Sequence, residues 1–330
     1  MKTLKGILLI LLIIVLFNSC KKKELPIVNT WDIAVFSEAV RCSGTLKGEG
    51  VVERGFKWRT DQEPDYQNGK TAIDNRTNYF VTTILGLSPR TTYYLKAYAT
   101  NSEGTAYSLE REIITSQTGT FTDNRDSKTY KWVEIGDQIW MAENLSYLPF
   151  VSSYTSDTGI YVFNYTGTSA DIARKQEEYK KYGCLYSWEI ALEVCPDGWH
   201  LPSRDEWEEL EETIVLNSEV IYRSKKYYAY YGDFLKEAES NYWSSPLNKP
   251  NNATSFSALP AGYHFRTFDS SSNKDIYFLG MGTYTGFWSS TTFSDFSFVI
   301  ALSSGTRDMI KNVSEKNYGY SIRCLKDQFY

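Results

Sequence analysis

Residues 195–207 carry the clearest folding signal in the chain and read Cys-Pro-Asp-Gly-Trp-His-Leu-Pro-Ser-Arg-Asp-Glu-Trp. Ser203 and Glu206 have the spacing of a capping box, in which the hydroxyl and the carboxylate each take a free backbone amide at a helix start. Apolar residues then recur at three- and four-residue steps: Trp207, Leu210 and Ile214. This spacing predicts a helix that begins after Ser203 and buries one face.

The segment before this stretch predicts a second helix. Its apolar residues share one helical face: Leu185, Trp188, Leu192 and Cys195. The Pro-Asp-Gly sequence at residues 196–198 would stop this helix. Acidic residues crowd the helix after Ser203: Asp205, Glu206, Glu208, Glu209, Glu211 and Glu212. We interpret them as a solvated face near the positive end of the helix dipole, in preference to a paired-carboxylate or cation site.

Away from these helices the pattern changes to strands and loops. Residues 130–142 alternate around a central Gly-Asp pair, which predicts a hairpin. Residues 149–180 have no clear period and are interpreted as an insertion. From about residue 240 onward we expect a loop-rich chain that ends in a strand within residues 320–325.

The N-terminal part, residues 28–116, predicts short strands. Residues 51–58 and 79–84 are two candidates, and residues 92–100 alternate between two faces. Gly, Asn and Asp punctuate the gaps at the spacing of an all-β sandwich.

Residues 87–93, Leu-Ser-Pro-Arg-Thr-Thr-Tyr, resemble the segment that leads into strand F of fibronectin type III domains. Residues 97–104, Ala-Tyr-Ala-Thr-Asn-Ser-Glu-Gly, continue the family pattern. The resemblance implies a β-sandwich in which the Tyr93 hydroxyl bonds back to nearby backbone and locks a corner. It also implies a turn at the Asn-x-x-Gly stretch. Residues 117–127 lack apolar periodicity, and we assign them as a linker.

Several motifs of the second half are very particular. In chain order they are Ile-Gly-Asp-Gln-Ile-Trp-Met-Ala-Glu-Asn-Leu at 135–145, Tyr-Gly-Cys-Leu-Tyr-Ser-Trp at 182–188, the stretch at 195–207, Phe-Ser-Ala-Leu-Pro-Ala-Gly-Tyr at 256–263, Phe-Trp-Ser-Ser-Thr at 287–291 and Gly-Tyr-Ser-Ile-Arg-Cys at 319–324. Together they resemble the Fibrobacter succinogenes major paralogous domain. The resemblance implies an α+β domain over residues 128–327, related in plan to C-type-lectin-like and formylglycine-generating-enzyme folds. It also implies an exported lipoprotein, often with fibronectin-like modules.

The lectin-like plan implies one disulfide. In that fold the end of the first helix is bridged to the last strand, and Cys195 and Cys324 occupy those places. If the helix before residue 195 forms, Cys184 lies about 16 Å from Cys195, which is beyond the reach of a disulfide. We therefore expect Cys184 and Cys42 to be buried free thiols.

The N-terminus predicts export and lipidation. Lys2 and Lys5 precede an apolar run at residues 7–17, about 16 Å long as a helix and too short to span a bilayer. The sequence up to Cys20 resembles a lipoprotein signal, in which this cysteine receives the lipid. Lys21 is not the Asp that favours inner-membrane retention, so we expect an outer-membrane lipoprotein, at the periplasmic face or the cell surface. The implied signal peptide and lipidated tether are residues 1–19 and 20–27.

Composition excludes some partners. With 35 Lys+Arg against 40 Asp+Glu, the net charge is −5, which disfavours binding to nucleic acid. The chain has only 2 His, so a multi-histidine metal site is not expected.

The catalytic interpretations find little support. Formylglycine-generating enzymes need a copper-binding cysteine pair late in the domain, where this chain has only Cys324. His200 follows Trp199 in a motif that favours packing at the helix start over a general base. His264 has no Ser or Cys nucleophile at a suggestive spacing. We therefore expect no enzymatic activity.

The calcium signature of C-type lectins is also missing. Lys249-Pro-Asn lacks the acid that precedes proline in that signature, and Trp288 is followed by two serines rather than Asn-Asp. We expect no metal site of this kind and no cofactor. The sequence does not exclude a structural calcium ion elsewhere in the protein.

A binding surface remains as the expected function. Candidate ligand-binding residues lie in the late loops: Trp243, Asn251, Asn252, Tyr263, Arg266, Tyr284 and Trp288. Tyr263 and Trp288 stand in family motifs and are predicted to be core residues, whereas Trp243, Arg266 and Tyr284 are predicted to be exposed. We expect non-catalytic recognition of a glycan or protein at the cell envelope. The alternatives are a structural envelope protein without a discrete ligand and a cryptic enzyme on the formylglycine-enzyme plan.

Overall fold

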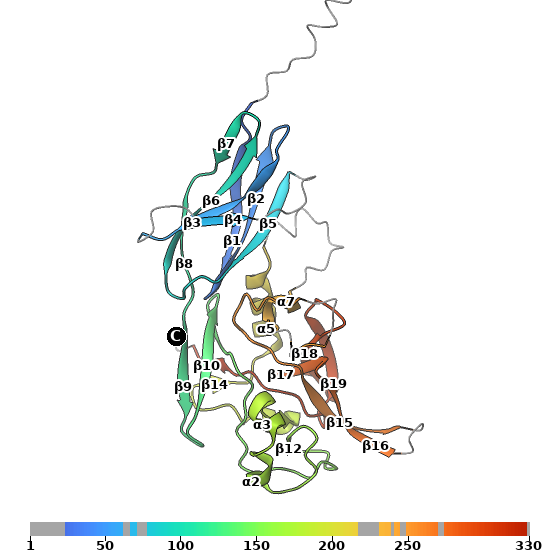
Figure 1. Cartoon of the computed structure of the whole chain (residues 1–330). Helices are drawn as coiled ribbons and strands as arrows, with labels where there is room; N and C mark the ends of the chain where they lie inside the picture. The colour runs from blue at the N-terminus through green and yellow to red at the C-terminus, as the bar shows by residue number, and fades with distance from the viewer. Residues whose placement is uncertain are drawn as a thin grey trace, which may run out of the picture. The chain divides into compact units, whose positions relative to one another are not determined.

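The computed structural model describes most of the chain after the predicted signal peptide. The described residues are 24–61, 67–70, 78–216, 231–238, 241–244, 249–269 and 274–328. The signal peptide and the predicted lipidation site Cys20 lie outside them. In this part of the chain no helix is long and apolar enough to cross a membrane. The structure is mainly β-sheet, divided among several sheets (Figure 1).

The chain forms two compact units. The first holds the described residues up to Trp31 with Ser43–Thr82 and Tyr94–Arg111, and the second holds Asp32–Cys42, Thr83–Tyr93 and the chain from Glu112 onward. Several N-terminal strands have residues in both units, so these units do not follow the sequence linearly.

The N-terminal strands form two sheets. The three-stranded sheet has the order β1 (Ile27–Val35), β2 (Ala39–Lys47), β5 (Tyr79–Leu85). The other has the order β4 (Gln67–Lys70), β3 (Glu53–Arg59), β6 (Thr92–Asn101), β7 (Gly104–Tyr107), with β8 (Arg111–Ile114) also paired to β6. The three strands predicted from sequence are confirmed as β3, β5 and β6.

The alternation predicted along β6 is present. Its buried face consists of Tyr93, Leu95, Ala97 and Ala99. The Tyr93 hydroxyl accepts a hydrogen bond from the Ser88 amide at 2.9 Å, the corner contact that was expected. At the following turn, Asn101 Oδ1 accepts from the Glu103 amide at 2.9 Å. Side-chain hydrogen bonds therefore fix the backbone at both ends of this strand.

The first sheet of the C-terminal part has five strands. Their order is β14 (Trp199–His200), β20 (Leu325–Lys326), β11 (Gln138–Met141), β10 (Lys128–Ile135), β9 (Thr118–Asp123). The predicted hairpin is confirmed as β10 and β11, which meet at the Ile135–Gln138 pair around Gly136, whose φ is +62°. Glycine adopts such a φ at little cost because it has no Cβ.

The segment assigned as a linker is instead largely a strand. β9 pairs with β10 from Thr118 to Asp123, so the sheet begins ten residues earlier than the predicted domain. One face of this strand is solvated and carries polar side chains, so its sequence lacks the apolar alternation from which a strand is predicted. Phe121 supplies an anchor, since its ring stacks on Trp199 at 4.3 Å between centroids.

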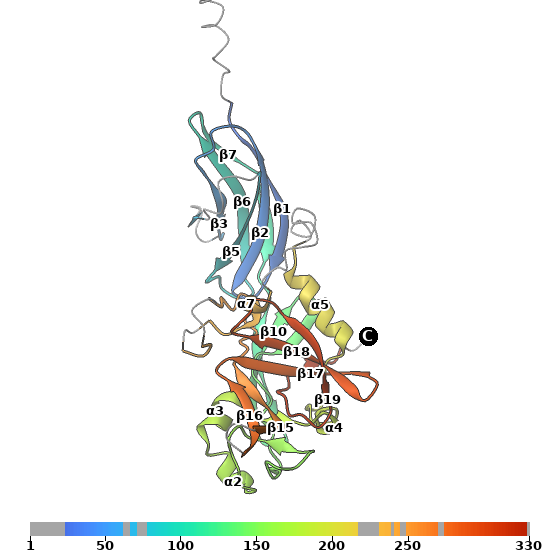
Figure 2. The same ribbon diagram turned by 90° about the vertical axis from the view of Figure 1, so that its right-hand side faces the viewer.

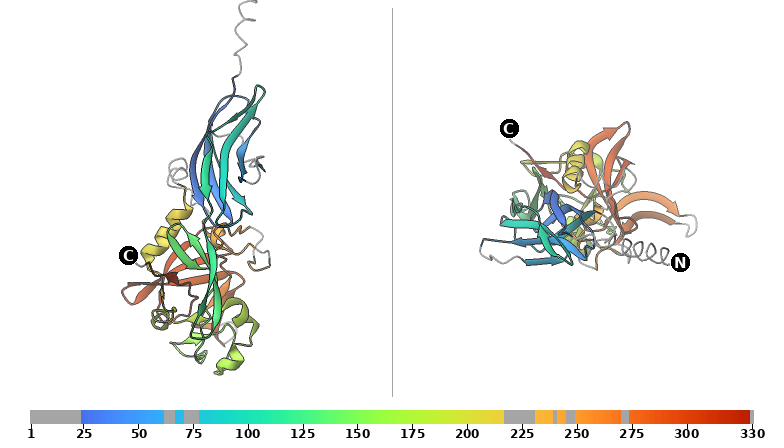
Figure 3. Two further views of the ribbon diagram at one scale, coloured as in Figure 1. Left: turned by 90° about the vertical axis from the view of Figure 1, so that its left-hand side faces the viewer. Right: turned by 90° about the horizontal axis from the view of Figure 1, so that it is seen from above.

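The predicted helix after Ser203 is confirmed as α5 (Arg204–Ile214), with its capping box formed. Its predicted apolar face is fully buried. Trp207 packs on Trp140 of β11 at 4.5 Å between ring centroids and on Phe287 at 5.8 Å. Helix α5 and the last described residues lie next to each other (Figures 2 and 3).

The predicted helix before Cys195 is wrong. The segment forms the short strand β13 (Leu185–Tyr186) and the single-turn helix α4 (Trp188–Ala191). Residues 185 and 186 pair with β12 (Ile160–Tyr161), and this long-range pairing outweighs the local helical spacing. The segment interpreted as an insertion thus contributes β12, together with the helices α2 (Ala170–Ala173) and α3 (Glu177–Tyr182).

The predicted loop-rich region also needs correction, because it contains a five-stranded sheet. After the short helix α7 (Gly232–Leu235), the order in this sheet is β16 (Lys274–Met281), β15 (Ala261–Asp269), β17 (Tyr284–Phe293), β18 (Phe296–Ser303), β19 (Ile310–Glu315). Ser, Thr and Gly are frequent in these strands, so apolar and polar residues do not alternate clearly along their sequences. The predicted final strand is shorter than expected, and Tyr320 and Ser321 form only isolated bridges.

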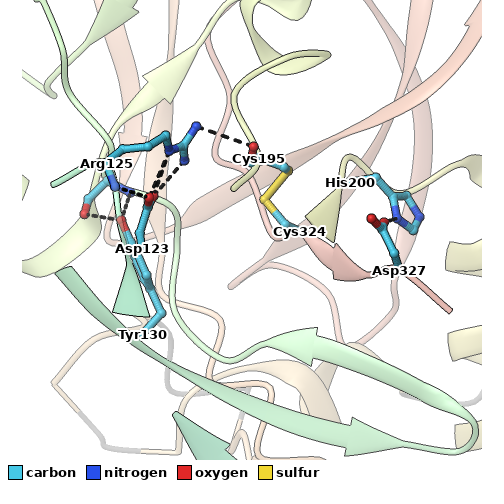
Figure 4. The surroundings of a disulfide bond; sticks show 8 residues. Asp123, Arg125, Tyr130, Cys195, His200, Cys324 and Asp327 are labelled. Atoms are coloured by element: carbon cyan, nitrogen blue, oxygen red, sulfur yellow. Dashed lines mark hydrogen bonds and ion pairs between the residues drawn. A yellow bond between two sulfur atoms is a disulfide. The ribbon is translucent and has the colours of Figure 1, made fainter. Parts of the chain in front are cut away.

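The disulfide between Cys195 and Cys324 is present, with a Cα–Cα distance of 5.9 Å (Figure 4). Cys42 and Cys184 are free and buried, as predicted. Burial raises the pKa of the Cys184 thiol to about 12, so it stays protonated and unreactive. Cys184 and Cys324 belong to the same apolar core, which also takes in Trp288 and Ile322.

Candidate functional site

A groove lined by four tyrosines lies on the sheet of β15, β17, β18 and β19. It is open to solvent and has a volume of about 630 Å³. Its aromatic lining is Tyr263, Tyr284, Tyr318 and Tyr320. We call this cavity the tyrosine groove.

Backbone pairing brings the four tyrosines together. Gly262 of β15 pairs with Thr285 of β17 and thereby places Tyr263 next to Tyr284. His264 and Gly319 exchange backbone hydrogen bonds of 2.9 and 2.8 Å. Because side chains alternate along extended backbone, the residues on either side of Gly319 share the face that carries Tyr263. Gly286 leaves the space that the Tyr320 ring occupies, since a Cβ there would overlap it.

Tyr263 is the centre of this aromatic cluster. Its ring lies 5.3 Å from Tyr284, 5.6 Å from Tyr320 and 6.5 Å from Tyr318, measured between centroids. The rings of Tyr318 and Tyr320 are within 8° and 22° of parallel to Tyr263, whereas Tyr284 is turned by 63°. Three rings therefore have nearly parallel faces, and the fourth presents its edge.

The tyrosines are neutral hydrogen-bonding groups. Burial raises the pKa of all four phenols, that of Tyr284 to about 12. Tyr320 shares a 3.2 Å hydrogen bond with the Ser314 hydroxyl. The hydroxyls of Tyr263 and Tyr318 have no hydrogen-bond partner among the described residues, so they are free to bind water or a ligand.

The rest of the groove mixes polar and exposed apolar side chains. Its polar members are Thr283, Ser303, Asn312, Ser314 and Glu315, and its partly exposed apolar members are Leu279, Phe296 and Val313. Glu315 is the one charged residue in the described lining. The groove therefore offers hydroxyl and amide groups beside aromatic faces, with a negative charge at one end.

A smaller cavity of about 140 Å³ adjoins the groove and shares Glu315 and Tyr318 with it. We call it the histidine pocket, because its wall includes His264, which is only 2% exposed. The His264 ring stacks on Tyr161 at 3.7 Å, and its Nε2 lies 2.8 Å from the Tyr154 carbonyl oxygen. Burial lowers the pKa of His264, so the ring is neutral at pH 7.

The neutral state fixes the histidine tautomer. A carbonyl oxygen can only accept, so Nε2 carries the proton and Nδ1 is left as an acceptor. This Nδ1 is buried and has no partner in the described structure. Such an orphan acceptor costs free energy unless a water or a ligand donates to it.

Arg266 stands at the mouth of the histidine pocket. Its side chain is 60% exposed, as predicted, and lies 3.3 Å from an Asp275 carboxylate oxygen. The Tyr277 hydroxyl donates to the same carboxylate at 3.1 Å. The positive charge of Arg266 is thus already paired with the carboxylate of Asp275.

Three of the seven predicted binding residues meet at these cavities, namely Tyr263, Tyr284 and Arg266. Tyr263 and Tyr284 are both half-buried, so neither the core position nor the exposed one predicted for them is right. Sequence reasoning missed Tyr318 and Tyr320. Their Tyr-Gly-Tyr alternation was the available signal, but its strand partner could not be identified from the sequence.

The other four predicted residues lie elsewhere. Trp243 is 6% exposed and its Nε1 donates to the Ala258 carbonyl at 3.1 Å, so the prediction that it is exposed was wrong. Trp288 is a core residue, as predicted, and its Nε1 donates to the Tyr186 carbonyl at 2.7 Å. The Asn251 side chain accepts from the Ala253 amide, and Asn252 lines a different cavity.

His200 has a structural partner on each side. Its Nδ1 lies 2.6 Å from an Asp327 oxygen (Figure 4). Its Nε2 lies 2.8 Å from a Glu206 oxygen, so His200 joins the C-terminal segment to the start of α5. The hydrogen bond to Glu206 outweighs burial and raises the pKa of His200.

In the part of the chain that is described, no three His, Cys, Asp or Glu side chains are grouped so as to hold a metal ion.

Comparison with known proteins supports one assignment. No curated protein matches the chain. The sequence model described as the Fibrobacter succinogenes major domain matches residues 133–326, which is more than half of the chain. The match covers the turn and second strand of the hairpin, α5, the disulfide and every element of the tyrosine groove. The chain therefore belongs to the Fibrobacter succinogenes major domain family.

Proposed function

We propose that this protein is a non-catalytic recognition module of the cell envelope, which binds a glycan or a protein through the tyrosine groove. In this proposal residues 1–19 are a signal peptide and Cys20 carries a lipid that anchors the protein to the outer membrane. The N-terminal strands act as a fibronectin type III-like spacer. The C-terminal part follows a C-type-lectin-like plan.

Two features support the proposed folds. The Tyr93 hydroxyl bond to the Ser88 amide has the form of the tyrosine corner found in fibronectin-like sandwiches. The disulfide joins Cys195, which follows α4, to Cys324, which directly precedes the last strand β20, and the lectin-like plan implies such a bond.

The tyrosine groove is the observation on which the proposed function depends. Aromatic rings that face an open cavity beside hydrogen-bonding groups are typical of ligand-binding sites. Tyr263 and Tyr318 combine a partly exposed ring with an unpaired hydroxyl, and this combination suits ligand binding. The donors and acceptors around them would orient that ligand.

A binding screen tests the proposal. The protein is applied to a glycan array and, in parallel, used to pull down cell-wall material and envelope proteins. We expect a saturable ligand whose binding is at least tenfold weaker for Tyr318→Ala, because that variant removes one face of the aromatic platform. Tyr107→Ala is the matched control, since it removes an exposed tyrosine from another strand.

The control should bind like the natural protein. If no saturable ligand is found, the structural envelope alternative replaces the proposal. If a ligand binds equally well to Tyr318→Ala, the protein has a binding site but it is not this groove.

A further inference from the structure

We infer that the ligand of the tyrosine groove is a saccharide chain without acidic groups, and that one of its sugar residues enters the histidine pocket. The inference rests on the proposed function, because it names the class of ligand for the same groove. Ring geometry and charge support it independently.

The ring geometry favours sugars over cationic ligands of the quaternary ammonium type. An aromatic cage surrounds such a cation with ring faces from several directions. Here Tyr318 and Tyr320 lie within 8° and 22° of parallel to Tyr263, and only Tyr284 is turned, by 63°. Three of the four rings therefore share one orientation, which we call a platform, and do not surround a central point. A platform suits the flat face of a sugar ring, whose C–H groups are attracted to the negative face of an aromatic ring.

The charges disfavour an acidic ligand. Asp157 in the histidine pocket and Glu315 between the two cavities are both exposed. Their carboxylates have no ion pair or hydrogen bond among the described residues. Arg266 is the only cation in the described lining of either cavity, and Asp275 neutralises it. A uronic or sialic acid would therefore meet two unpaired negative charges and no free positive one.

The histidine pocket is lined by groups that accept hydrogen bonds. The carboxylates of Asp157 and Glu315 can only accept, whereas the His264 Nδ1 is shielded from the cavity. Sugar hydroxyls donate to such carboxylates, and Asn317 supplies a donor for the ring or glycosidic oxygens. The pocket volume of about 140 Å³ equals that of roughly five liquid water molecules, which suits a single sugar residue.

The two cavities adjoin through Tyr318 and Glu315, so one ligand can occupy both. The groove would bind successive sugar rings by stacking, and the pocket would bind the hydroxyl-rich end. This division of roles separates affinity, which the tyrosines supply, from discrimination against acids, which Asp157 and Glu315 supply.

The test uses the full protein on an array of neutral, amino-bearing and acidic oligosaccharides. We expect saturable binding to neutral or amino-bearing chains and at least tenfold weaker binding to uronic or sialylated ones. Tenfold corresponds to about 1.4 kcal/mol. In the double variant Asp157→Asn, Glu315→Gln the discrimination should fall to about threefold or less. Glu193→Gln, which removes an exposed carboxylate outside both cavities, should leave it unchanged.

The outcomes separate this inference from the proposed function. Strongest binding to acidic glycans, or full discrimination in the double variant, would overturn the inference while the groove stays a binding site. The same holds if only proteins bind and Tyr318→Ala weakens them. Binding of any class that Tyr318→Ala leaves intact would overturn both.

Discussion

His200 shows how one side chain can make stability depend on pH. Its imidazole lies between carboxylates of Glu206 and Asp327, and the hydrogen bond to Glu206 raises the pKa of His200. Burial alone would raise the pKa of Glu206, but hydrogen bonds from His200 and Ser203 outweigh burial and lower it to about 2. Both shifts favour the charged pair.

The sign of each contribution follows from these directions. The histidine is bound more tightly as the cation, so its contribution is complete below its ordinary pKa of 6.5 and is lost as the pH rises through the raised value. Glu206 contributes fully above its ordinary pKa of 4.5 and loses its contribution as the pH falls toward 2. The pair therefore stabilises the fold most between about pH 4.5 and 6.5.

We predict that His200→Gln lowers the free energy of unfolding by about 1 kcal/mol in this window and by less at pH 9. The modest size reflects the partial exposure of all three groups, which solvent screens. Urea unfolding of both proteins across this pH range measures the difference. The titration of His264 is common to both proteins and cancels. A difference that grows with rising pH would contradict the prediction.

At the scale of the element, α5 begins where side chains replace missing backbone partners. The Ser203 hydroxyl accepts from the Glu206 amide at 3.2 Å, and the Glu206 carboxylate accepts from the Ser203 amide at 2.7 Å. We predict that Ser203→Ala destabilises the protein by about 1 kcal/mol, since one amide loses its acceptor. Ser102→Ala, at an exposed turn, is the control for serine removal and should change the urea midpoint little. Equal midpoints for both variants would show that the cap contributes nothing measurable.

The elements that sequence analysis predicted correctly are those whose signals are local. The capping box at Ser203, the turn at Gly136 and the alternation around Tyr93 each depend on residues a few positions apart. The expected helix before Cys195 failed because Leu185 pairs with Tyr161, and no local pattern contains that contact. The sheet of β15 to β19 was missed for a similar reason, because its strands are half polar and gain their stability from one another.

The candidate site was only partly predictable for the same physical reason. Aromatic side chains in late segments could be recognised as a class of binding residue. Which of them share a face depends on the pairing of His264 with Gly319 and of Gly262 with Thr285. These contacts bring Tyr318 and Tyr320 to Tyr263. The register of these strand pairings cannot be deduced from a single sequence.

At the scale of the whole molecule, one covalent bond constrains most of the C-terminal chain. Cys195 and Cys324 are 129 positions apart, and the loop between them includes α5 and every strand of the tyrosine groove. Closing a loop of this length removes much of the freedom of the unfolded chain. In the chain-entropy description this amounts to about 4–5 kcal/mol of stability.

We predict that Cys195→Ala, Cys324→Ala loses up to this amount in urea unfolding, and that reductant lowers the stability of the natural protein to a similar level. The double variant should not respond to reductant, which separates the effect of the bond from any effect of reductant on Cys42 and Cys184. Peptide mapping without reduction should find residues 195 and 324 joined.

Because Cys324 lies in the same buried core as Trp288, loss of the bond should also loosen the part of β17 that contains Trp288. Amide exchange in residues 284–293 should therefore quicken in the double variant by more than the loss of global stability accounts for. A quickening no larger than that loss would show that the bond acts on the unfolded chain alone.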